Sequence, residues 1–174
     1  MRFFLIFLSV ASFGFALFTK ERKALPKIDT ACSQILWKAR SRSETILIYV
    51  NKWEIIQSEK SYIVKMDLRS LDSKNLVRDL HLKSQDFFAT EQYPFLFFHV
   101  ELMEQMTDES VMIHGKVKIK SSENKLSFAL QKNAKEKVWV SEFPVDRTKF
   151  GIYYANTIFP IENRIDISLK LCEQ

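Results

Sequence analysis

Alternation of apolar and polar residues, with a period of two, runs through most of the chain from residue 34 onward. The clearest case is VMIHGKVKIK at 111–120, where Val, Ile, Gly, Val and Ile alternate with Met, His and three lysines. A period of two is the pattern of a β-strand with one buried face. No long helical pattern separates the successive strands, so we expect antiparallel connections. The alternation therefore predicts an all-β fold.

Eight such segments are expected in chain order. They lie near residues 34–39, 46–50, 62–68, 96–102, 111–119, 126–130, 138–145 and 165–171. Closing an antiparallel sheet of this size into a barrel removes its exposed edges. We therefore predict an eight-stranded antiparallel barrel with a short helical insertion after the third strand. Such a barrel is either filled by its own side chains or holds one slender ligand, and the alternation leaves both outcomes open.

The predicted insertion lies between residues 70 and 94 and begins with SLDSKNLVRDL. Asp72 and Ser73 can accept hydrogen bonds from the first free N–H groups of a helix that follows them. Leu76 and Leu80 then lie one turn apart on one face of that helix.

Three charged residues of the insertion, Arg78, Asp79 and Asp86, form a predicted polar cluster. It can bind the head group of a ligand, or it can fix the insertion against the rim of the barrel. We favour the structural role, in which Arg78 pairs with at least one acidic residue and holds Phe87 and Phe88 against the barrel.

The first sixteen residues, MRFFLIFLSVASFGFA, have the pattern of a secretory signal peptide, with Gly14 and Ala16 before a candidate cleavage site. The alternative is an uncleaved membrane anchor, although an apolar run of about sixteen residues is shorter than the ~20 that span a bilayer. Residues 17–27 then form a short tether, and residues 28–174 form one domain. These boundaries predict a periplasmic or secreted protein.

The two cysteines, Cys32 and Cys172, lie at the start of the first predicted strand and the end of the last. Those two points are neighbours in a closed antiparallel barrel. An even cysteine count in an exported protein favours a disulfide, and two unpaired buried thiols are the alternative.

The insertion and the strand after it resemble the signature of the YceI-like family, the polyisoprenoid-binding, lipocalin-like periplasmic β-barrels. Segments 28–37 and 146–152 are also similar to that family, so the resemblance covers about residues 28–171. The residues that carry the signature are Ser70, Leu71, Asp72, Asn75, Arg78, Asp79, His81, Leu82, Ser84, Asp86, Phe87, Phe88, Tyr93, Pro94 and Phe98.

The resemblance implies an exported binding protein that holds an isoprenoid quinone or polyprenyl lipid in a barrel cavity, as a carrier or store. A linear hydrocarbon needs an apolar and mostly pre-formed cavity. The membrane is then expected only as a source of lipid, and the oligomeric state is open. The alternative is a filled barrel that serves as a structural or protein-interaction module of the cell envelope. The candidate ligand-binding residues are Leu96, Phe98, Val117, Phe128, Trp139, Phe150 and Ile167.

Other kinds of site are not expected. The histidines, His81, His99 and His114, lie on separate elements without the spacing of a zinc site. The sequence shows no nucleophile elbow, phosphate-binding loop or activating partner for either cysteine. The lysine-rich strand face at 116–120 lacks interleaved aromatic residues, and the net charge of +5 is mild. We therefore expect no metal, no cofactor other than a bound lipid, no nucleic-acid partner and no enzymatic activity.

Overall fold

A computed structural model describes residues 26–58, 61–133, 135–154 and 160–174. Its helical elements are η1 (Leu68–Ser70), α1 (Leu76–Lys83) and η2 (Arg147–Phe150). No helix within the described ranges is long and apolar enough to cross a bilayer. The predicted signal peptide, residues 1–16, and most of the predicted tether lie outside the described residues. The strands are β1 (Ile28–Ser41), β2 (Thr45–Val50), β3 (Trp53–Gln57), β4 (Tyr62–Asp67), β5 (Leu71–Asp72), β6 (Phe95–Thr107), β7 (Ser110–Ile119), β8 (Ser122–Asn133), β9 (Val138–Asp146) and β10 (Ile161–Glu173).

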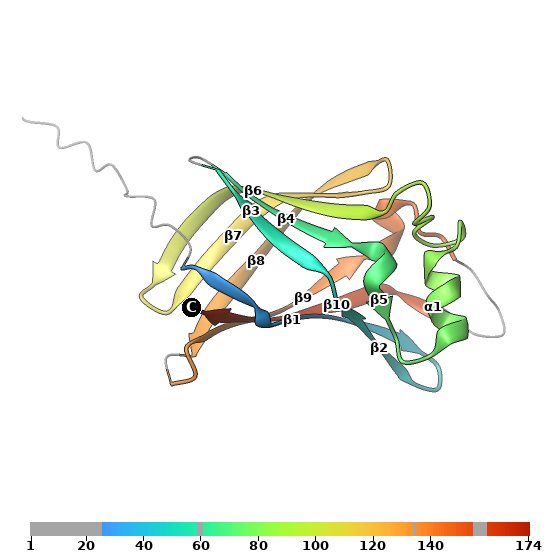
Figure 1. Ribbon diagram of the computed structural model, residues 1–174, viewed down its shortest axis with the longest axis horizontal. Helices are drawn as coiled ribbons and strands as arrows, with labels where there is room; N and C mark the ends of the chain where they lie inside the picture. The colour runs from blue at the N-terminus through green and yellow to red at the C-terminus, as the bar shows by residue number, and fades with distance from the viewer. Residues whose placement is uncertain (1–25, 59–60, 134, 155–159) are drawn as a thin grey trace, which may run out of the picture.

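All ten strands belong to one antiparallel sheet, in the order β3-β4-β6-β7-β8-β9-β10-β1-β2-β5. β3 is the strand at one edge of this sheet, and β2 lies next to the other edge. Only Asn51 and Lys52 separate β2 from β3 in the chain, so the two edges must lie close together and the sheet curls. Figure 1 shows the curled sheet from the side, with α1 at one end and the C-terminus at the other. The predicted all-β, antiparallel architecture is confirmed.

The predicted number of strands, eight, is wrong, because the described chain has ten. The two additional strands are β3 and β5. β3 continues the direction of β2 but changes its pairing partner at Asn51 and Lys52, where the alternation of apolar residues is interrupted. β5 has only two residues, which is too short for a period of two to be visible. The helical insertion follows β4, the third of the eight predicted strands, after η1 and β5.

Packed side chains close the interior at the α1 end. Leu68 in η1 is fully buried, and Leu71 in β5 is 2% exposed. Phe88, from the segment after α1, lies with its ring 5.6 Å from the ring of Trp37 on β1. Phe150 in η2 is also buried at this end. Because these side chains come from the insertion and from η2, the segments outside the regular sheet are what close it.

α1 contacts the rest of the protein through the side opposite its leucine pair. Asn75 caps the helix, because its side chain accepts a hydrogen bond from the Arg78 N–H at 3.0 Å. Leu82 is buried. Leu76 and Leu80 do share a helix face, but that face is exposed to solvent. The cap is thus Asn75, and not Asp72 or Ser73 as predicted, so the helix begins slightly later in the chain. The spacing of its leucines does not mark its buried side.

Candidate functional site

A cavity of about 140 Å³ lies inside the curled sheet. Eight of the ten strands contribute to its wall, all except β2 and β5. Every residue that lines it is apolar or aromatic, and among the described lining residues Tyr62 alone carries a hydroxyl group. Such a wall accommodates hydrocarbon and offers no charged group to a polar ligand.

Six of the seven predicted ligand-binding residues line this cavity, and their contact with a ligand stays a prediction. Phe150 is the exception: it is buried but does not line the cavity. It belongs to η2, beyond the end of β9, so the alternation of the strand no longer sets the direction of its side chain. The six are Leu96, Phe98, Val117, Phe128, Trp139 and Ile167.

Between β8 and β9, two aromatic side chains close the cavity wall where the strands are not hydrogen-bonded to each other. β8 and β9 pair only beside their connecting turn, between Gln131↔Val140 and Asn133↔Val138. Where the pairing ends, Phe128 on β8 stacks on Phe143 on β9, with ring centroids 4.3 Å apart and planes 10° apart. Phe143 was not predicted to line the cavity, although it lies four residues from Trp139 and therefore on the same face of the strand.

The cavity reaches the surface at the end away from α1. A pocket of about 170 Å³ opens there, and its polar lining residues are Lys27, Gln57, Tyr62 and Gln174. An apolar interior next to a polar rim fits a molecule with an apolar tail and a polar head group. We call this pocket the mouth. The residues that line both the cavity and the mouth are Pro26, Ile28, Ile55 and Tyr62.

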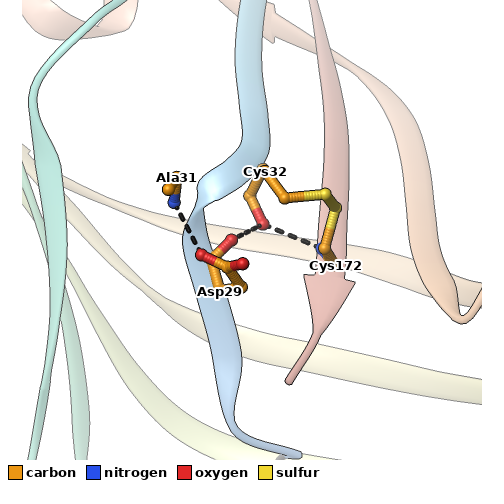
Figure 2. Close-up of a disulfide and its surroundings, with 5 residues drawn as sticks. Asp29, Ala31, Cys32 and Cys172 are labelled. Carbon is orange, nitrogen blue, oxygen red and sulfur yellow. Dashed lines mark hydrogen bonds between the residues drawn. A yellow bond between two sulfur atoms is a disulfide. The ribbon is translucent and has the colours of Figure 1, made fainter.

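A disulfide lies near the mouth. Cys32 and Cys172 are bonded, with Cα atoms 5.9 Å apart, and join β1 to β10 (Figure 2). The register of these strands shifts between Asp29 and Gln34. The Ser33 hydroxyl crosses the shift, because it donates to the Asp29 carbonyl at 2.6 Å and accepts from the Cys172 N–H at 2.8 Å. The disulfide and the hydroxyl together hold an irregular part of β1 beside the mouth.

The residues of the predicted polar cluster are not brought together. The Arg78 guanidinium donates to the Glu44 carboxylate at 3.0 Å, between α1 and the turn that joins β1 to β2. The Asp79 carboxylate accepts from the Ser73 N–H at 2.7 Å and from its hydroxyl at 2.6 Å. Consecutive side chains point about 100° apart around a helix. The side chains of Arg78 and Asp79 therefore point in different directions. Arg78 thus pairs with an acidic residue, as predicted, and that residue, Glu44, lies outside the predicted cluster.

Asp86 belongs to a different group. One of its carboxylate oxygens lies 3.6 Å from Nε2 of His81. The His81 ring contacts the rings of Phe87 and Tyr154, with centroids 5.0 and 4.9 Å apart. Aromatic contacts therefore hold Phe87, whereas the prediction gave that role to Arg78.

Arg147 was predicted only as part of a motif, and it organises the closed end of the sheet. It is 7% exposed, and its burial lowers the pKa of the guanidinium below its ordinary value. A guanidinium presents five N–H donors in a fixed geometry, which suits several carbonyls at once. Four backbone carbonyls accept its hydrogen bonds: Ile152 at 2.6 Å, Tyr154 at 2.9 Å, Glu162 at 3.1 Å and Ile161 at 3.2 Å.

Within the described ranges, no group of three or more His, Cys, Asp or Glu side chains is placed to hold a metal ion. His114, for example, has other neighbours at both ring nitrogens. Its Nδ1 lies 2.8 Å from the Ser127 hydroxyl, and its Nε2 lies 3.7 Å from the Glu104 carboxylate. Its ring nitrogens therefore have neighbours on adjacent strands of the sheet.

A family model described as YceI-like domain matches residues 27–172. BcnA from Burkholderia cenocepacia has a similar structure, with a TM-score of 0.72 and 15% identity, over 83% of this chain and 98% of that chain. A polyisoprenoid binding domain from Saccharophagus degradans, implicated in plant cell wall breakdown, has a TM-score of 0.66 and 9% identity, over 83% and 94%. A Campylobacter jejuni YceI protein has a TM-score of 0.59 and 17% identity, over 100% and 99%. No curated protein matches the sequence. At these identities the structural likeness shows the fold.

Proposed function

We propose that this chain, which belongs to the YceI-like family, holds an isoprenoid-like apolar lipid non-covalently in its cavity, as a carrier or store. The observation that supports this function most directly is the cavity wall, which is apolar on every side and leads to a polar mouth. Moving the apolar surface of a lipid tail from water to such a wall is favourable by ~25 cal/mol per Å². The function is binding, without a catalytic step.

The proposed ligand is an isoprenoid quinone or a polyprenyl lipid, with its tail in the cavity and its head group at the mouth. Lys27 at the mouth favours an anionic or polar head group. The polyisoprenoid binding domain among the similar structures supports this ligand class. A periplasmic or secreted location suits the Cys32–Cys172 bond, since disulfides persist in oxidising compartments.

The volume of the cavity favours a second candidate function. At about 140 Å³ the cavity is smaller than the ~300–1,000 Å³ of most small-molecule sites. A filled barrel would instead serve as a structural or protein-interaction module of the cell envelope. The lipid-binding function therefore requires lining side chains to change rotamer when the tail enters. Met66 lines the cavity with a flexible, unbranched thioether side chain. Phe128 and Phe143 line it where β8 and β9 are no longer paired. These three are our candidates for that change.

Native mass spectrometry distinguishes the two functions. Protein purified from its own host is expected to carry one lipid per chain, and extraction is expected to yield an isoprenoid. Protein that arrives without lipid, and that also takes up no octaprenyl quinone when this quinone is added, would support the filled barrel.

A further inference from the structure

α1 carries an exposed apolar face at the end of the molecule opposite the mouth (Figure 1). Leu76, Val77 and Leu80 are 74%, 77% and 62% exposed. They lie within about 100° of one another around the helix axis. We call these three side chains, Leu76, Val77 and Leu80, the α1 patch.

The charges near the α1 patch suit an anionic partner. Lys83 lies on the same side of the helix as Leu76, because seven residues make nearly two turns. Arg42 lies near Val77, since both line one surface pocket. Among the described residues, Lys83 and Arg42 form no salt bridge. Two carboxylates of this region already have cationic partners: Asp72 pairs with Lys74, and Glu44 pairs with Arg78.

We propose that the α1 patch is a docking surface for an anionic lipid bilayer. Aliphatic side chains on one face of a helix, with cations at the boundary of that face, are the pattern of a helix that lies in the membrane interface. Leu76, Val77 and Leu80 enter the boundary between head groups and acyl chains, and Lys83 and Arg42 contact the lipid phosphates.

The size of the α1 patch argues against a second copy of the chain as its partner. Three exposed side chains are far fewer than the roughly 20–30 residues, about 800 Å², that each partner of a stable protein interface contributes. A bilayer needs no complementary surface, so a small patch is sufficient. This inference goes beyond the proposed function, because the patch and the mouth lie at opposite ends and either can act without the other.

A fluorescent label at the α1 patch tests the proposal. Both cysteines of the chain are in the disulfide, so Val77→Cys provides a single thiol for an environment-sensitive label such as nitrobenzoxadiazole. We expect the emission of this label to shift to the blue with vesicles that contain phosphatidylglycerol. The shift should be smaller with pure phosphatidylcholine, and high salt should reduce it by screening the phosphates. The matched control is Met106→Cys in the β6–β7 hairpin, 58% exposed and at the other end of the molecule, whose label should stay in water.

A second pair of variants tests whether the leucines carry the binding. In the labelled protein, Leu76→Ser with Leu80→Ser should lower the partition into phosphatidylglycerol vesicles about tenfold or more, since two leucines lose their burial. Ile56→Ser with Leu102→Ser, at positions 44% and 40% exposed on β3 and β6, should leave it unchanged. All four positions are exposed, so the variants should fold.

Three results would overturn the proposal. The label at position 77 could stay in water with phosphatidylglycerol vesicles, or it could shift no more than the label at position 106. Without vesicles, its emission could also shift to the blue as the protein concentration rises, which would indicate that the patch binds a second copy of the chain. Because the label reports on position 77 itself, binding through another segment does not imitate the expected result. Retention of lipid by the same variants should be unchanged, which separates this test from that of the proposed function.

Discussion

Two arginines illustrate how the surroundings of a side chain decide its contribution to stability. Arg78 pairs with Glu44, and the two side chains are 28% and 53% exposed. Arg147 is buried and donates to four backbone carbonyls without a carboxylate among these acceptors. An exposed ion pair is worth about 0–1 kcal/mol, whereas removal of a buried charged donor leaves its acceptors without partners.

We predict that Arg147→Ala lowers the free energy of unfolding by roughly 3–5 kcal/mol. Arg78→Ala should lower it by less than about 1 kcal/mol, although the sequence alone suggested a structural role for Arg78. Urea titrations of the two variants give both values, and Arg147→Lys should fall between Arg147→Ala and the unchanged protein. Equal losses for the two alanine variants would contradict this assignment. Arg78→Ala protein that is stable but no longer retains lipid would make Arg78 a head-group ligand.

At the scale of the elements, Glu173 connects three strands near the mouth. Its carboxylate on β10 accepts from Nζ of Lys132 on β8 at 2.8 Å and from Nε1 of Trp139 on β9 at 2.7 Å. The hydrogen bond from Lys132, followed by that from Trp139, lowers the pKa of Glu173 below its ordinary value of 4.5. A carboxyl group with a lowered pKa in the folded state stabilises the fold above its unfolded pKa. This stabilisation is lost as the pH falls through the folded pKa.

Glu173→Gln should therefore reduce the dependence of stability on pH in the acid range. From neutral pH to below 4.5, the unchanged protein should lose more thermal stability than the variant, because only the carboxylate gains a proton there. The pKa values of Asp67, Asp72 and Asp146 are also lowered, so both proteins remain sensitive to acid. The measurement is the melting temperature against pH for the two proteins. Parallel curves would show that Glu173 does not contribute in this way.

The elements also show what the sequence could predict. Alternation identified the long strands, and with them six of the lining residues, because a period of two states which side chains share a face. A periodic pattern does not show whether that face is buried or exposed. Leu76 and Leu80 share a face as predicted, yet that face is exposed. Phe150 was assigned to the cavity, but its strand ends at Asp146, and the side chains of η2 follow another geometry.

The partners of the polar side chains were beyond prediction for a related reason. Glu44, the partner of Arg78, is thirty-four residues away in the sequence, and Arg147 finds its acceptors in backbone carbonyls, which every residue has. The reason for a glycine at position 115 also lies in the folded structure. An ideal Cβ at this position would lie 2.6 Å from the Phe98 ring, so glycine allows that ring to lie over β7. Such contacts depend on the folded backbone and leave no periodic pattern.

For the molecule as a whole, the disulfide joins two residues 140 positions apart in the sequence. Cross-linking so long a loop restricts the unfolded chain, and on the chain-entropy model it stabilises by up to about 4–5 kcal/mol. We predict a loss of this size for the double variant Cys32→Ser and Cys172→Ser, measured by urea titration. Reduction of the unchanged protein should give the same loss. A double variant as stable as the oxidised protein would contradict the prediction, as would two thiols that react with an alkylating agent without prior reduction.

The central claim is that the interior of the curled sheet holds a lipid tail, and two substitutions on β7 test it in neighbouring positions. Val117 lines the cavity and pairs with Phe98 across β6 and β7, whereas Lys118 is exposed on the opposite face of the same strand. A tryptophan at position 117 fills the space while keeping it apolar, and a tryptophan at position 118 adds the same side chain outside. Circular dichroism establishes that both variants are folded.

The most direct measurement is the amount of octaprenyl quinone bound per chain, by native mass spectrometry, for these two variants and the unchanged protein. We predict one quinone on the unchanged protein and on Lys118→Trp, and a loss of most or all binding for Val117→Trp. Folded Val117→Trp protein that binds the quinone as well as Lys118→Trp does would contradict the claim and move the binding site outside the cavity.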